Sequence, residues 1–179
     1  LLRADGNAAE NVNGIPAGAL MEAMTSAWDI LRSACSRVDA LAAHQADFDK
    51  SFCESHIGNR LWICTREDLR WPKAGAGTSL IATALAHGVA VVAAHRAIND
   101  CLLLARLFEA VPDIAERLEA ARLHALLPKV RLVADVSYED RDLAKEAGFK
   151  WDAARKEWWR LMAQVDAEGF PFRTKVVNV

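Results

Sequence analysis

The chain has 179 residues, 53% of them hydrophobic, and a formal net charge of −2. This length fits one medium domain, or one domain with a small addition, and the apolar content is sufficient for a core. The near-neutral charge excludes a strong overall basic field, although a local basic groove or bound cations could still attract nucleic acid.

The cysteines and the hydropathy of the chain indicate the cytoplasm. No apolar run approaches the ~20 residues that a membrane span needs, and no signal peptide opens the sequence. The first residue is Leu1 rather than Met, so we expect a fragment of a longer protein. The cysteines are widely spaced without a CxxC pair, which argues against a zinc site or a disulfide framework: Cys35, Cys53, Cys64 and Cys101.

Hydrophobic spacing predicts short strands alternating with helices in the first two thirds of the chain. We expect Thr65 to cap a short turn that carries Asp68. This alternation is typical of an α/β domain. The expected elements are a loop over 1–17, helices over 18–36, 48–56, 79–87, 95–110 and 112–126, strands over 38–43 and 61–64, and a Gly-rich loop over 71–78.

At Pro128 the helical spacing of apolar residues gives way to the alternating pattern of a strand, and we place a domain boundary at residues 126–130. The two expected domains cover residues 1–126 and 129–179, the second being a small α+β module. Its expected elements are a strand over 129–136, a helix over 139–147 capped by Gly148, a β-hairpin over 149–160, a short helix at Asp166 and a last strand over 171–177.

Two acidic motifs in the first domain each follow a short apolar run: Ala-His-Gln-Ala-Asp-Phe-Asp at 43–49 and Ala-His-Arg-Ala-Ile-Asn-Asp at 94–100. In α/β proteins, catalytic groups gather where strands end and helices begin. Asp49, His95 and Asp100 are the groups needed to hold hard cations and to deprotonate a water molecule.

These motifs resemble the second and third exonuclease motifs of the DEDDh 3′–5′ exonucleases, the family of the proofreading epsilon subunit of bacterial DNA polymerase III. The resemblance covers roughly residues 1–110, including Asn13-Gly14-Ile15 and the stretch at 62–65, where Cys64 replaces an Asp of the family. It implies an RNase H-like exonuclease domain that lacks its first strands.

The resemblance also implies roles for three residues. Asp49 and Asp100 would bind two Mg²⁺ or Mn²⁺ ions, and His95 would be the general base that activates water. The reaction would be hydrolysis of the terminal phosphodiester of a DNA strand, with RNA as a possible substrate. The implied partners are a DNA single strand or 3′ end and a polymerase or repair protein, in DNA replication or DNA repair.

Two departures from the family pattern bear on activity. The chain contains no Asp-x-Glu followed by a Thr-Gly turn, so two carboxylates of the cation site are missing and we expect this fragment to be inactive. Gln45 stands where the family usually has Asn. The alternative is a non-catalytic protein that kept the fold and binds nucleic acid or another protein.

Simpler interpretations exist for most acidic residues and histidines. Asp49 could be only a negative charge favoured by a helix N-terminus. We expect His44 to be structural and Asp47 to be solvated. The other histidines are expected on the surface or in caps: His56, His87 and His124.

The second domain resembles a small module of unknown function found attached to primases and exonucleases. The resemblance rests on a Tyr with acidic residues at 138–142, an Ala-containing helix, and Gly-Phe-Lys-Trp-Asp at 148–152 followed by Lys156 and Trp158. Interleaved basic and aromatic residues can stack bases and hold phosphates. We therefore name as nucleic-acid-binding candidates Lys150, Trp151, Lys156, Trp158 and Arg160. Alternatively, the tryptophans form the core of a module too small to fold without them.

Overall fold

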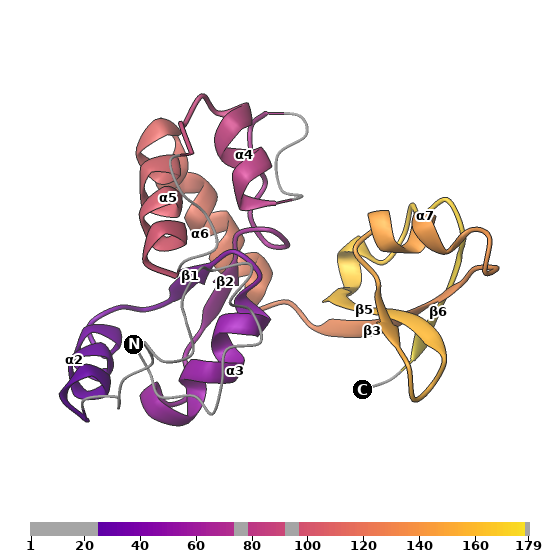
Figure 1. Cartoon of the computed structure of the whole chain (residues 1–179), viewed down its shortest axis with the longest axis horizontal. Helices are drawn as coiled ribbons and strands as arrows, with labels where there is room; N and C mark the ends of the chain where they lie inside the picture. The colour runs from indigo at the N-terminus through magenta and orange to yellow at the C-terminus, as the bar shows by residue number, and fades with distance from the viewer. Residues whose placement is uncertain (1–24, 74–78, 92–96, 178–179) are drawn as a thin grey trace, which may run out of the picture. The chain divides into compact units, whose positions relative to one another are not determined.

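The computed structural model describes residues 25–73, 79–91 and 97–177, and it divides the chain into two compact units, Leu1–Ala125 and Leu126–Val179 (Figure 1). The expected boundary at 126–130 lies at this division. The described residues form helices and two sheets, so the chain is of the mixed α/β class that the sequence predicts. The expected loop over 1–17 and the motif at 13–15 lie outside the described residues.

The centre of the first unit is a parallel pair of short strands. β1 (Leu41–Ala43) pairs with β2 (Trp62–Cys64), and α3 (Ala46–Ile57) connects them. Parallel strands require such a crossover, and α3 packs against both. Gln45 has a left-handed backbone, with φ of 69°, which turns the chain from β1 directly into α3. The start of α3 is therefore held beside the carboxyl end of β1.

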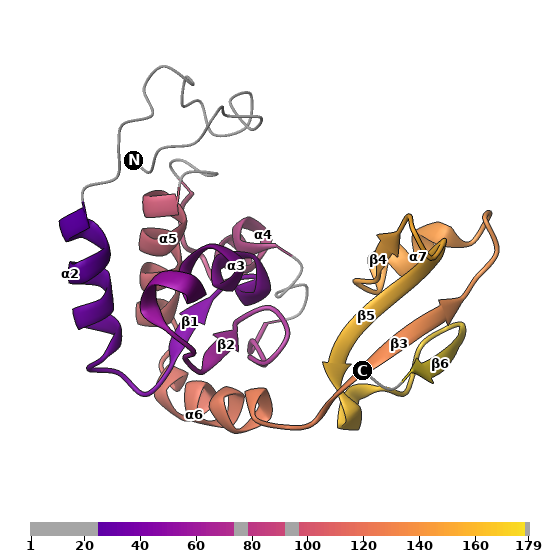
Figure 2. The same cartoon turned by 90° about the horizontal axis from the view of Figure 1, so that it is seen from below.

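In the described part of the first unit, four further helices lie around this strand pair (Figure 2). On one side α2 packs against α3, where the rings of Trp28 and His56 stack with centroids 3.7 Å apart. α6 packs against β2, and α4 packs against α5. The bounds of these helices are α2 (Thr25–Cys35), α4 (Leu80–Ala86), α5 (Ala97–Ala110) and α6 (Ile114–Ala125). The last three confirm the expected helices within a few residues. α2 confirms the described part of the helix expected over 18–36, whose residues 18–24 lie outside the described residues.

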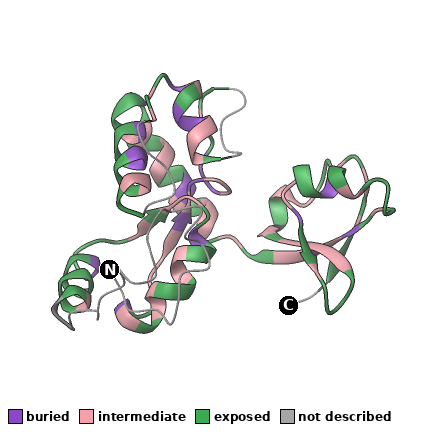
Figure 3. Ribbon diagram, viewed as in Figure 1, coloured by how far each residue is buried: buried purple, intermediate pink, exposed green. Residues whose placement is uncertain are grey.

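Apolar packing joins α6 to β2 in the first unit. Ile63, Leu69 and Ala121 are buried together, and the ring of Trp71 lies against them, stacked with Phe108. Figure 3 shows buried positions on β2 and on the inward sides of the helices.

His87 also belongs to this interior. It is buried, its Nδ1 lies 2.8 Å from the Thr83 carbonyl oxygen, and its ring packs edge-on against the ring of Trp71. Of the two roles expected for His87, the capping role is confirmed, because His87 is the C-cap of α4, whereas a surface position is not.

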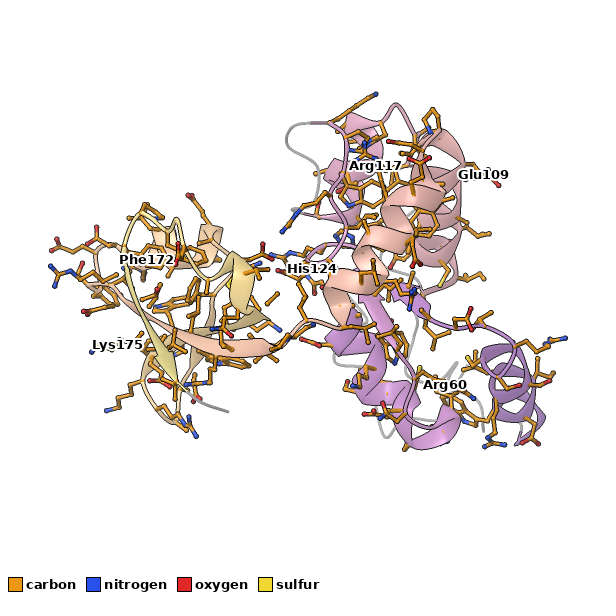
Figure 4. All side chains as sticks on the ribbon, turned by 180° about the vertical axis from the view of Figure 1, so that it is seen from behind. Arg60, Glu109, Arg117, His124, Phe172 and Lys175 are labelled. Atoms are coloured by element: carbon orange, nitrogen blue, oxygen red, sulfur yellow. The ribbon has the colours of Figure 1, made fainter. Side chains whose placement is uncertain are left out.

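A buried carboxylate joins the end of β2 to α6. Asp68 is only 4% exposed, and its Oδ2 accepts the Cys64 backbone N–H at 2.7 Å. Its Oδ1 accepts a hydrogen bond from Nδ1 of His124 at 2.9 Å. His124 lies on the last turn of α6 (Figure 4). Asp68 thus holds the turn that Thr65 was expected to cap, whereas the Thr65 hydroxyl lies 3.1 Å from Nδ1 of His44. The partly buried His124 is this carboxylate's partner and not simply a surface group.

Removing the Asp68 carboxylate should destabilise the first unit. Asp68→Ala leaves the Cys64 N–H and the His124 ring without their acceptor, which should lower the free energy of unfolding by about 1–3 kcal/mol. Hydrogen exchange of peptides covering 61–65, measured in increasing urea, reports this directly. The exposed Asp47→Ala removes the same charge and should change little; equal effects of the two substitutions would contradict the role of Asp68.

The second unit is an antiparallel sheet of four strands in the order β4-β5-β3-β6, with one short helix, α7. Its elements confirm those expected from the sequence. Their bounds are β3 (Lys129–Asp135), α7 (Arg141–Glu146), β4 (Lys150–Asp152), β5 (Glu157–Ala163), the 3₁₀ turn η2 (Gln164–Asp166) and β6 (Arg173–Val177).

One face of this sheet carries the core of the second unit. Leu132 and Ala144 are fully buried, and Phe149 packs with the rings of Phe170 and Phe172. Phe172 lies in this core, whereas Lys175 on β6 is exposed (Figure 4). The phenylalanines, rather than the tryptophans alone, therefore close the core.

None of the helices in the described residues is long and apolar enough to cross a membrane.

Candidate functional site

Asp49 and Asp100 occupy equivalent places on two helices of the first unit. Asp49 lies in the first turn of α3, directly after β1, and Asp100 lies in the first turn of α5. Both side chains are partly exposed, so they combine restricted hydration with access from solvent.

The charge of Asp100 acts on the carboxyl group of Asp49. Burial raises the pKa of Asp49, its own backbone hydrogen bond opposes that effect, and the negative charge of Asp100 raises the pKa further. The Cys101 thiol feels both groups: burial raises its pKa, and the charges of Asp49 and Asp100 add to that shift. Burial and the charge of Asp49 likewise raise the pKa of Cys53. α3 and α5 therefore bring the two motif aspartates into one electrostatic neighbourhood.

The chemistry of this pair fits a divalent cation in part. Two carboxylates supply at most four oxygen ligands, whereas Mg²⁺ takes about six and usually keeps several waters. Within residues 25–73, 79–91 and 97–177, no group of three or more His, Cys, Asp or Glu side chains is arranged to hold a metal ion. His95, the candidate general base, lies outside the described residues.

Besides Asp49, the first acidic motif, at 43–49, contains His44 and Asp47. His44 has a structural role and Asp47 is solvated. His44 bonds to Thr65 across the ends of β1 and β2, where the Thr65 N–H also donates to the Ala43 carbonyl oxygen. Its Nε2 is buried and makes no hydrogen bond with the part of the chain that the structure describes. Asp47 is exposed. His44 thus ties the two strands together.

The pKa of His44 makes the first unit sensitive to acid. Burial, with the positive charge of Arg66, lowers that pKa from the usual 6.5 to about 4. Between these pH values the unfolded chain binds a proton that the folded chain does not. Stability is therefore complete above about pH 6.5 and falls as the pH decreases toward 4.

Replacing His44 by Gln should remove this loss. We expect wild type to lose on the order of 1–2 kcal/mol between pH 6.5 and 4 relative to His44→Gln, a value reduced for the solvent that still reaches the ring. Urea unfolding of both proteins, followed by circular dichroism at several pH values, gives the difference. Parallel pH profiles for the two proteins would show that His44 does not titrate in this way.

The second unit contains a cavity of about 680 Å³ at the open end of its sheet. The cavity lies where the β4–β5 hairpin faces the end of β3 and the segment leading into α7. Three of the five nucleic-acid-binding candidates line it: Trp151, Lys156 and Trp158. The other lining residues are Ala134, Asp135, Val136, Ser137, Tyr138, Arg141 and Glu157.

The remaining two candidates lie elsewhere. Lys150 precedes Trp151 on β4, so the alternation of a strand directs it to the opposite face of the sheet. The Arg160 guanidinium donates to the Ala147 carbonyl oxygen at 2.6 Å and packs over Gly148, whose φ of +82° ends α7. Arg160 thus stabilises the C-terminus of α7.

The tryptophans of the module divide between packing and exposure. Trp158 packs against the core, but Trp151 is 51% exposed. Seven of the ten cavity residues were not among the sequence candidates, and Tyr138 and Arg141 are two of these seven. Tyr138 lies three residues before Arg141, the first residue of α7, and the guanidinium of Arg141 stacks on the Tyr138 ring. This spacing of an aromatic and a basic residue was the feature of the sequence that could have indicated the pair.

Comparison with known proteins gives a family match within the second unit. Residues 130–177 match a family described as "Domain of unknown function (DUF8626)". No curated protein and no solved structure matches the chain. The match covers the whole four-stranded sheet apart from the first residue of β3, and the family description names no activity.

Proposed function

We propose that the first unit is an RNase H-like exonuclease domain of the DEDDh type, which hydrolyses the terminal phosphodiester of a DNA strand from its 3′ end with two Mg²⁺ or Mn²⁺ ions. The observation that carries the proposal is the shared neighbourhood of Asp49 and Asp100. These aspartates come from two sequence motifs, each at the start of a helix.

The charges of the pair explain why a cation would bind there. Two carboxylates whose charges disfavour each other gain most from a divalent ion that bridges or neighbours both. Asp49 and Asp100 would each offer a hard oxygen ligand. When bound, the ions would stabilise the charge on the attacking and leaving oxygens of the phosphodiester.

The fold supports the role of Asp49 through the placement of α3. Gln45 turns the chain so that α3 begins directly after β1, and the hydrogen bonds of Asp68 and Thr65 fix the neighbouring end of β2. A rigid support of this kind keeps carboxylates at fixed positions, as metal ligands require. In this proposal His95, just before α5, takes the proton from the attacking water.

The sequence lacks the Asp-x-Glu and Thr-Gly pattern that the resemblance assigns to the first exonuclease motif. We therefore expect residues 1–179 to bind the ion through Asp49 and Asp100 but to release no nucleotides from DNA. Hydrolysis should appear only when that motif is supplied.

Metal binding tests the proposed site in this chain. Asp100→Asn should weaken Mn²⁺ binding about tenfold or more, because it removes one of two charged ligands. Electron paramagnetic resonance of free Mn²⁺ during a titration measures the affinity.

Asp47→Asn is the matched control. Asp47 is exposed in the same first turn of α3 as Asp49, so this substitution removes an equal charge from the same helix end. Its affinity for Mn²⁺ should equal that of wild type, whereas Asp49→Asn should behave like Asp100→Asn. Equal affinities for all four proteins would overturn the proposed site.

A further inference from the structure

The cavity of the second unit presents aromatic surface to solvent. Tyr138 is 81% exposed and Trp151 is 51% exposed, although large aromatic side chains in a small domain usually supply its core. Trp151 lies opposite Trp158 across the β4–β5 pair, with ring centroids 5.6 Å apart. Trp158 is held by the core on its other side. The unit thus offers aromatic ring faces in a cavity of about 680 Å³, a size typical of ligand sites.

Positive charge accompanies these rings. The guanidinium of Arg141 lies 4.2 Å from the centre of the Tyr138 ring, and its Nη1 donates to the Tyr138 carbonyl oxygen. Neither Arg141 nor Lys156 forms an ion pair with any described residue. The Glu157 carboxylate, in contrast, is already paired with Arg131 at 2.7 Å. The charges left for a ligand are therefore two cations and the single carboxylate of Asp135.

The position of Lys156 is conformationally unusual. Its φ of 54° places it in the left-handed region, in the turn where the Asp152 carboxylate accepts the N–H groups of Ala154 and Arg155. Glycine adopts this conformation without the steric cost that a side chain carries. The turn nevertheless holds a lysine that lines the cavity.

We propose that this cavity binds single-stranded nucleic acid. Bases stack on the exposed faces of Tyr138 and Trp151, and the adjacent phosphates are held by Arg141 and Lys156. Stacking needs a ring face but no particular base, so binding is tolerant of sequence. Asp135 at the rim can accept a hydrogen bond from a base amino group.

Arg141 and Lys156, which form no ion pair with any described residue, favour this ligand over a proline-rich peptide, which also binds grooves lined by aromatic side chains. A peptide of that class gains nothing from two unpaired positive charges, whereas a phosphate backbone does. A duplex is disfavoured because its bases are already stacked on one another and cannot reach the rings. The site is also independent of the carboxylate pair in the first unit, since none of its residues belongs to that unit.

Fluorescence anisotropy of the full chain with a labelled single strand of about 12 nucleotides tests the proposal. EDTA in all samples removes divalent ions, so the outcome does not depend on metal binding by Asp49 and Asp100. Parallel titrations use the corresponding duplex, a nucleoside monophosphate and a proline-rich peptide. The single strand should bind best and lose affinity as salt increases, because bound cations release counterions from the backbone.

Two aromatic substitutions and one rescue test the stacking surface. Tyr138→Ala and Trp151→Ala should each weaken single-strand binding by about fivefold or more, and Tyr138→Phe should retain it. Both rings are exposed, so circular dichroism should show an intact fold for each variant.

A pair of lysines in the same hairpin supplies the matched charge test. Lys156→Gln should weaken binding and reduce the dependence on salt, whereas Lys150→Gln, on the opposite sheet face, should change neither. Lys156→Gly should raise the urea midpoint of the second unit while weakening binding, which separates recognition from stability.

Three results would overturn the proposal. They are no binding of the single strand by wild type, equal binding by wild type, Tyr138→Ala and Trp151→Ala, and tighter binding of the duplex or the peptide than of the single strand. The last would assign the cavity to a different partner.

Discussion

The buried carboxylate of Asp68 is the constraint on which the first unit depends. It accepts the Cys64 N–H where β2 ends and the His124 ring from α6, so one side chain fixes both the end of a strand and the helix packed on it. A buried charge of this kind is costly unless its oxygens are satisfied, and here both oxygens have partners. The neighbouring end of β1 is held through His44 and Thr65, and α3 starts directly beyond it. The position of Asp49 is therefore a consequence of how the strand pair is terminated.

Each unit carries side chains whose environment would be improved by a ligand: carboxylates in the first unit and aromatic rings in the second. In the first unit, burial and like charge make Asp49 harder to ionise, a situation that a divalent cation would relieve. In the second, the phenylalanine cluster completes the core and leaves Trp151 and Tyr138 outside it. A domain this small gains stability from every buried ring. The exposed rings, beside two cations that form no ion pair with any described residue, therefore support the ligand site that we propose.

Much of the fold could be predicted from the sequence because hydrophobic period, capping residues and turn residues agree locally. Pro128, Gly148 and the polar turn after Asp152 mark the ends of elements that the structure contains. The sequence could not reveal that Asp68 meets His124, because that bond joins segments far apart in the chain. The burial of His87 was missed for the same reason. In the second unit, nothing in the sequence distinguished Arg160 from the other basic candidates for nucleic-acid binding. The fold shows that Arg160 bonds to the C-terminus of α7, whereas Arg141 lines the cavity.

We propose that Asp49 and Asp100 together hold a divalent cation, and an anomalous difference map from crystals of this chain soaked in Mn²⁺ would locate the ion. We expect a peak within bonding distance of carboxylate oxygens from both residues, roughly 2.0–2.6 Å as for other hard cations. A map with Mn²⁺ bound elsewhere, and with no density between these two side chains, would contradict it.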